Sequence, residues 1–183
     1  MNVRRVVTGH SPDGKAVFAS DEQVAGITLA LAPGTEFHRL WGADSVMRFP
    51  DDGSKPSAHD YFPPVGGYRV GMFTVAPTTA VAPTTVATAA PDMEAAVSEF
   101  ETLLPGLAGH MEPDHPGMHT TATVDFEYVI SGRCVLELDD GATVEVGPGD
   151  TVVQNGTRHA WRNPYAEPCV MLVVLVGAHH DKR

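Results

Sequence analysis

The segment from His119 to Asn163 constrains the fold of this 183-residue chain more than any other. In its first half, every second residue carries a polar or charged side chain: His119, Thr121, Thr123, Asp125 and Glu127. Successive side chains of a β-strand point to opposite faces, so an extended backbone places these five on one face. This alternation predicts a strand with a polar inner face.

The second half of the segment repeats the pattern. His159, Trp161 and Asn163 also share one parity, and the apolar run between the halves contains Asp139-Asp140-Gly141, a triplet typical of a tight hairpin turn. A hairpin there would fold the second half back toward the first. We therefore expect both histidines on one interior wall.

These motifs resemble those of the cupin family, commonly G-x5-H-x-H-x3,4-E-x6-G and G-x5-P-x-G-x2-H-x3-N. The resemblance covers about residues 113 to 178, and the second motif is the better preserved. Thr121 stands where the family usually has its second histidine, and Asp125 replaces the usual glutamate. The chain looks like a small single-domain bacterial cupin whose first metal motif is degenerate.

The resemblance implies a metal site. Position by position, His119, His159 and Asp125 fall on metal-binding residues of the family, and imidazole nitrogen and carboxylate oxygen suit Fe, Zn, Ni or Mn. His115, four residues before His119, is the candidate to replace the ligand missing at Thr121. The alternative is a metal-free pocket in which the histidines bond to backbone carbonyls or to Asp125.

The remaining candidate site residues belong to catalysis and the substrate pocket. Glu127 is the expected general acid or base, and Asp125 is the expected metal ligand, but the two roles can be exchanged. Burial raises the pKa of a carboxyl unless a cation lies nearby, which suits either residue to proton transfer. Trp161 and Thr121 are expected to line the substrate pocket. Arg158 and Arg162 have the opposite parity to His159 and should lie outside it.

The element pattern predicts an all-β protein, a jelly-roll cupin barrel with an N-terminal strand extension and one short α-helix. Residues 1–183 are expected to form a single domain, with an extension over 1–66 and the barrel over 67–178. A connector and a helix are expected near 77–106, where Met93, Val97, Phe100 and Leu104 recur at helical spacing. The loop over 42–67 either covers a pocket or wraps the surface.

Composition limits the partners and the compartment. The net charge of -11 without a Lys/Arg cluster argues against nucleic acid and anionic membranes. Cys134 and Cys169 lie in apolar runs and are expected to be reduced. No stretch approaches the roughly 20 apolar residues of a membrane span, so a cytoplasmic protein is expected. A homodimer is a possible assembly.

The function expected from these features is a metal-dependent enzyme that acts on a small organic substrate with an apolar or aromatic body. The reaction would be oxygenation, or metal-assisted isomerisation, dehydration or decarboxylation. Two alternatives stay open at this point. One is a metal-free acid-base lyase, isomerase or cyclase, and the other is a non-catalytic ligand-binding or sensory cupin.

Overall fold

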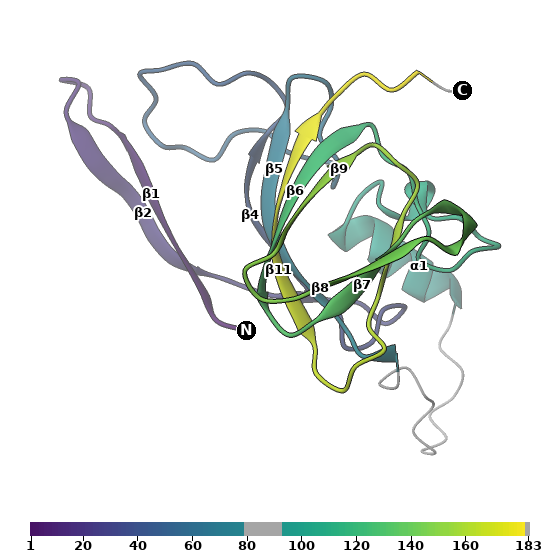
Figure 1. Cartoon of the computed structure of the whole chain (residues 1–183). Helices are drawn as coiled ribbons and strands as arrows, with labels where there is room; N and C mark the ends of the chain where they lie inside the picture. Colours follow the sequence, from purple (N-terminus) through teal and green to yellow (C-terminus); the bar gives the residue numbers. More distant parts are fainter. Residues whose placement is uncertain (79–92, 182–183) are drawn as a thin grey trace.

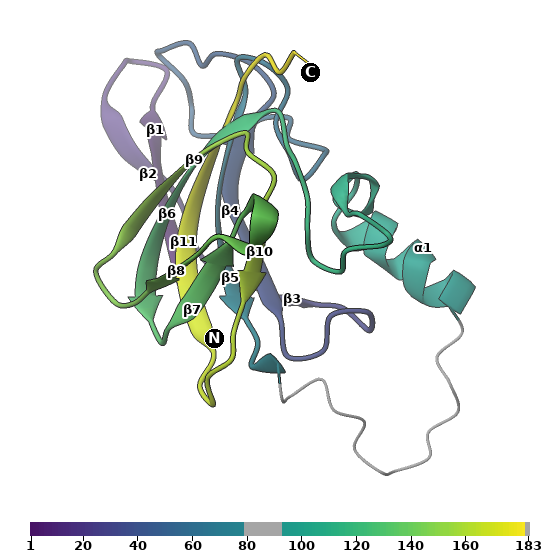
Figure 2. The same cartoon turned by 45° about the vertical axis from the view of Figure 1, so that its right-hand side comes forward.

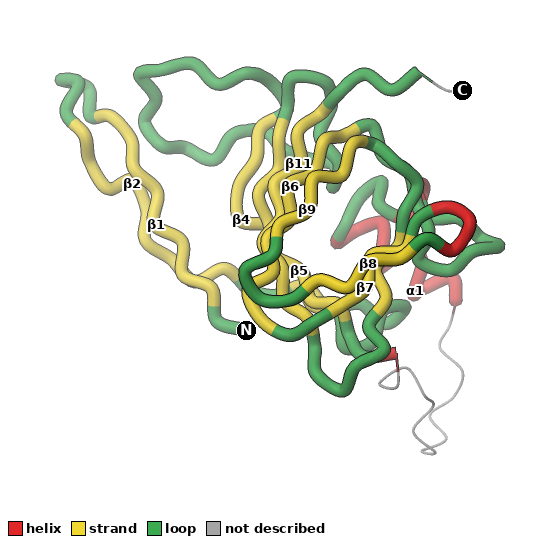
Figure 3. Tube along the Cα trace, viewed as in Figure 1, coloured by secondary structure: helices red, strands yellow, loops and turns green. Residues whose placement is uncertain are grey.

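The computed structural model describes residues 1–78 and 93–181 of the chain, and most of its regular structure is β-strand (Figures 1 and 3). The strands are β1 (Val3–His10), β2 (Ala16–Val24), β3 (Ile27–Thr28), β4 (Glu36–Ala43), β5 (Tyr68–Val75), β6 (Thr123–Ser131), β7 (Cys134–Glu137), β8 (Thr143–Val146), β9 (Thr151–Asn155), β10 (Ala160–Arg162) and β11 (Cys169–Gly177). The α-helix is α1 (Met93–Leu103).

Two antiparallel sheets form the barrel. The larger has the strand order β3-β4-β5-β11-β6-β9, and the smaller has the order β10-β7-β8. A core cluster joins them, because Val129 and Met171 of the larger sheet pack with Cys134 and Val146 of the smaller one. This is the expected jelly-roll barrel, and Figure 3 shows the strands arranged around its interior.

The first 66 residues divide differently from the prediction of an extension. β1 and β2 pair only with each other in a separate hairpin that flares away from the barrel (Figure 1). β3 and β4, in contrast, belong to the six-stranded sheet, because β4 pairs with β5 from Phe37 to Ala43. The barrel sheet therefore begins before residue 67, and only the hairpin is an appendage.

The outer face of the larger sheet carries partly exposed apolar side chains. In β11 the odd residues from Cys169 to Leu175 are buried and the even residues are half-buried or exposed. On the neighbouring β6, Phe126, Tyr128 and Ile130 point outward and are 47%, 45% and 44% exposed. Part of this outer face is therefore open to solvent.

Helix α1 packs on one side of the barrel (Figure 2). Ala96 and Leu104 are buried with Phe100 partly buried, whereas Met93 and Val97, predicted on the apolar face, are exposed. The spacing is helical as expected, and Phe100 and Leu104 pack against the protein as predicted, but Ala96 does so in place of Met93 and Val97. Residues 79–92, where the connector before this helix was expected, lie outside the described residues.

Two smaller predictions are confirmed. The triplet Asp139–Gly141 turns the chain between β7 and β8, and Asp140 and Gly141 have the positive φ values of 57° and 72° that such a turn requires. Cys134 and Cys169 are buried free cysteines. Among residues 1–78 and 93–181, no helix has the length and apolar character to cross a membrane.

Candidate active site

Strand β6 positions the two carboxylates. Asp125 and Glu127 lie opposite Leu175 and Val173 of β11, whose side chains are buried in the barrel. Directly opposed residues of an antiparallel pair share a face, so both carboxylates also point inward. They are 3% and 4% exposed, which confirms the inner face predicted by the alternation.

The two histidines come together across the barrel wall. The amide of His119 donates to the carbonyl of His159 (2.9 Å), and the amide of His159 donates back to the carbonyl of His119 (3.0 Å). Their ring centroids lie 4.2 Å apart. The expectation that both imidazoles reach one wall is therefore correct, and a backbone bridge between distant segments is the cause.

A backbone carbonyl orients each ring. Nδ1 of His119 bonds to the carbonyl of Gly117 (3.0 Å), and Nδ1 of His159 bonds to the carbonyl of Thr157 (2.9 Å). A carbonyl only accepts, so Nδ1 carries the proton in both rings and the lone pair remains on Nε2. This is the tautomer that a metal or an acidic proton can engage through Nε2.

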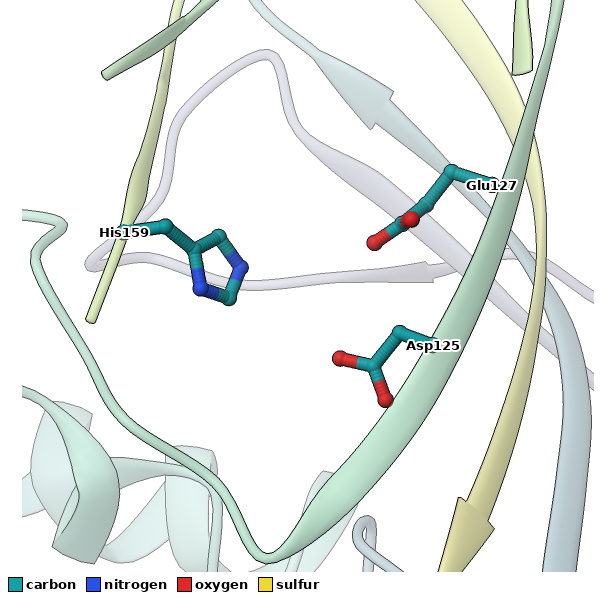
Figure 4. A group of neighbouring side chains, drawn as sticks. All are labelled: Asp125, Glu127 and His159. Carbon is teal, nitrogen blue, oxygen red and sulfur yellow. The ribbon is translucent and has the colours of Figure 1, made fainter. Parts of the chain in front are cut away.

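Asp125, Glu127 and His159 form a compact donor cluster (Figure 4). Figure 4 shows the two carboxylates extending from β6 toward the His159 ring on the opposite wall. One ligand atom from each residue lies within 4.8 Å of the others. Oδ1 of Asp125 and Oε2 of Glu127 are buried without a hydrogen-bond partner among the described residues, although such atoms are normally paired.

Burial shifts the pKa of each of these side chains in the direction that favours its neutral form. The pKa of Asp125 rises to about 6 because the carboxylate loses water. The pKa of Glu127 rises to about 8, first through burial and then through the charge of Asp125. Burial and the neighbouring His119 lower the pKa of His159 to about 4. Without a cation, the cluster therefore holds a proton on Glu127 at neutral pH.

The cluster opens into a cavity of about 370 Å³, a size that suits a small organic molecule. Trp161 and His119 line it, as predicted, and the rest of the wall is mostly apolar. Its aromatic and aliphatic residues include Phe37, Tyr61, Phe62, Phe73, Phe100, Leu107 and Met111.

Two predicted site residues lie elsewhere. Thr121 does not line the cavity, because its buried hydroxyl bonds to that of Thr123 (2.8 Å). The His115 side chain is 63% exposed and lies 3.4 Å from Glu112, since the turn at Pro116-Gly117 carries it to the surface. The structure therefore offers no ligand at His115. His119 stays beside His159 but outside the compact cluster, where Glu127 takes its place.

The two arginines expected outside the pocket do lie outside it. Arg158 pairs with Glu112 and Asp139, and Arg162 pairs with Glu137. Neither lines the cavity.

Sequence reasoning missed Tyr61 and Phe62, which line the cavity from the loop over 42–67. The Phe37 ring meets Tyr61 edge-on at 5.9 Å, and Tyr61 meets Phe62 in the same way at 5.0 Å. Of the two roles considered for this loop, covering a pocket is therefore the one observed. The adjacent aromatic pair within a Pro- and Gly-rich stretch was the available signal.

Part of the chain matches a known protein family and a curated relative. Residues 102–175 match the family model Cupin_2, described as a cupin domain. A curated relative, "Oryzines biosynthesis cluster protein J" of Aspergillus oryzae (strain ATCC 42149 / RIB 40), is 48% identical over 54 residues. That stretch is 27% of this chain and 30% of the relative, so the match spans less than a third of the relative's length.

Two solved structures resemble the chain at low identity. The polyketide cyclase RemF from Streptomyces resistomycificus is 17% identical, with a TM-score of 0.43 over 87% of this chain and 82% of that one. A Cupin 2 conserved barrel domain protein from Salinispora arenicola CNS-205 is 19% identical, with a TM-score of 0.39 over 82% of each chain. Residues 102–175, which match the cupin domain, contain six of the nine described strands of the two barrel sheets, β6 to β11 except for the last two residues of β11.

Proposed function

We propose that this protein is a metal-dependent enzyme acting on a small organic molecule with an apolar or aromatic body. The observation that carries the proposal is the donor cluster of Asp125, Glu127 and His159, which has two buried carboxylate oxygens without partners. Two buried carboxylates side by side repel each other unless a proton or a cation lies between them. A divalent cation would satisfy both oxygens at once.

The donor chemistry fits such an ion. One imidazole nitrogen and two carboxylate oxygens suit Fe, Zn, Ni or Mn, and the adjoining cavity leaves room for substrate. Asp125, Glu127 and His159 would hold the metal, with His119 next to them. Bound there, a divalent metal supplies Lewis-acid polarisation of a substrate oxygen.

The residues of the chain do the rest. The carbonyl of Thr157 fixes the His159 ring, so Nε2 keeps its orientation while substrate enters. Trp161, Phe37 and Phe73 supply flat apolar surface that excludes water from the reacting centre. With a metal bound, both carboxyls would stay ionised, so the oxygen of Glu127 or Asp125 that does not hold the metal would accept the proton in an isomerisation, dehydration or decarboxylation.

Metal analysis of untagged protein tests this proposal. We expect close to one divalent ion per chain in the wild type and in His115→Ala, because His115 is a surface histidine. Asp125→Asn and His159→Ala should lose most of it, with a fall of about tenfold or more in affinity. Thermal unfolding with and without added metal gives a second readout. Equal metal content in all four proteins contradicts the proposal.

A metal-free acid-base enzyme is the second candidate, and the raised carboxyl pKa values favour it. A carboxyl of pKa about 8 next to one of about 6 provides an acid and a base in one cavity at neutral pH. Turnover that persists after dialysis against a chelator, and that is lost in Glu127→Gln, would favour this candidate. Turnover that returns only with added metal favours the first.

A further inference from the structure

A second cavity, of about 120 Å³, adjoins the candidate active site. Phe37, Tyr61, Val173 and Leu175 line both cavities, so the two cavities are neighbours along these side chains. The walls differ in charge, however. The larger cavity contains Asp125 and Glu127, whereas the smaller one contains Arg39, Arg69 and Lys55 and no acidic residue.

Sheet register explains this separation of charge. Opposed residues across four strands form the row Arg39, Gly71, Val173 and Glu127. The next row contains Arg69, Leu175 and Asp125. All of these residues share the inner face of the sheet, with the acids on β6 and the arginines on β4 and β5. Neighbouring strands lie about 4.8 Å apart, so Arg39 is roughly 14 Å from Glu127 along the sheet.

The two arginines differ in how their charges are balanced. Arg69 is buried and fully used, because it pairs with Asp44 and donates to the carbonyls of Asp60, Ala43 and Tyr68. Asp44 therefore balances the charge of Arg69, and the three carbonyls use its other donors.

Arg39 forms no ion pair of this kind within the described residues. Its hydrogen bonds all leave from Nη2, to the carbonyls of Ala58 (2.9 Å), His59 (2.8 Å) and Asp60 (3.2 Å). Within the described ranges, these hydrogen bonds leave Nε and Nη1 unused. Burial and the neighbouring Arg69 lower the pKa of Arg39, while the charges of Asp60 and Asp44 act against this shift without forming an ion pair with the guanidinium. A half-buried charge of this kind attracts an anion.

We propose that the smaller cavity is a subsite for a carboxylate group of the ligand, bound by Arg39, while the apolar body of the ligand lies against Tyr61 in the larger cavity. One guanidinium without an ion pair matches one negative charge, because Lys55 is exposed and its charge is screened by water. The assignment of this ligand as the substrate rests on the proposed function. Binding of the carboxylate itself does not.

The test uses two probes that differ only in charge, 3-phenylpropanoate and 3-phenylpropanamide. Calorimetric titrations are made with full-length protein in excess chelator, so that a bound metal cannot hold the carboxylate. Wild type should bind the acid more tightly than the amide. Arg39→Met should lose about tenfold to a hundredfold in affinity for the acid, with little change for the amide. Arg4→Met, which changes an exposed arginine on the β1–β2 hairpin, should match the wild type.

Two results would overturn the subsite. One is wild-type protein that binds the acid no better than the amide, and the other is Arg39→Met with unchanged affinity for the acid. If Arg39→Met fails to fold, a crystal structure of the wild-type complex decides, since the carboxylate must contact the Arg39 guanidinium. Because these measurements exclude metal, a failed subsite leaves the metal-binding test unaffected, and a failed metal site leaves this one intact.

Discussion

Glu127→Gln is expected to stabilise the metal-free protein at alkaline pH. The folded protein raises the Glu127 pKa from 4.5 to about 8, and each unit is worth about 1.36 kcal/mol of folding free energy. Stability is fully present below about pH 4.5 and is lost as the pH rises through 8, because the unfolded chain releases the proton first. The wild type thus loses about 3 kcal/mol at pH 7, and about 5 kcal/mol at most above pH 8.

Glutamine keeps the shape of the side chain but has no proton to lose, so Glu127→Gln should escape this loss. Urea unfolding in chelator at about pH 5, 7 and 8.5 measures the free energy of unfolding of both proteins. The difference should be near zero at the lowest pH and grow to several kcal/mol at the highest. Glu167→Gln, at an exposed glutamate, is the control and should follow the wild type at every pH.

Added metal should reverse the order of stability. An ion at the cluster favours ionised Glu127, so the wild type should gain stability from Zn²⁺ or Mn²⁺ and Glu127→Gln should gain much less. If the wild type and Glu127→Gln instead show parallel pH dependences in chelator, Glu127 does not hold a proton in the folded state. The account of the buried carboxylate pair would then be refuted.

Three further changes test the packing and the site. Leu104→Ala should cost about 2–5 kcal/mol in unfolding free energy because Leu104 is 0% exposed beneath α1, whereas Val97→Ala on the exposed side should cost under about 0.5 kcal/mol. Asn163→Ala should lower the unfolding free energy by about 2–3 kcal/mol, as measured by chemical denaturation. The Asn163 side-chain amide donates to the carbonyls of Val75 and Glu167 and accepts from the amide of Tyr165. A loss of unfolding free energy below about 0.5 kcal/mol contradicts this. In Trp41→Phe, Trp161 is the remaining tryptophan, and its ring centroid lies 6.3 Å from that of His159. Co²⁺ bound at His159 should therefore quench the fluorescence of Trp161. Unchanged emission at saturating Co²⁺ contradicts a metal at His159.

Alternation alone predicted much of the barrel interior. The inward carboxylates of β6 and the hairpin at Asp139–Gly141 follow from periods and turn residues that the sequence displays. These features are local, since each depends on a few neighbouring residues. The meeting of His119 with His159 was also predictable, because the spacing of the motifs resembles that of a known family.

The membership of the donor cluster was harder to predict, because it depends on how far each side chain extends across the barrel. Glu127 has one more methylene than Asp125 and extends to His159, whereas His119 is held beside His159 by the bridge between their backbones. The subsite at Arg39 gave no sequence signal at all. Its position follows from the register of four strands and from an irregularity between Arg39 and Trp41, neither of which is encoded by local pattern.

Strand β6 serves two environments at once, with acids on its odd positions and exposed aromatic and aliphatic side chains at Phe126, Tyr128 and Ile130 on its even ones. Inserting or deleting a single residue near Val124 would exchange the two sets, turning the acids toward water and the rings into the cavity. A change of two residues would keep the parity and shift the acids by one row. Length variation in this strand is therefore tolerable only in even steps, a rule that libraries of shuffled or lengthened variants can exploit.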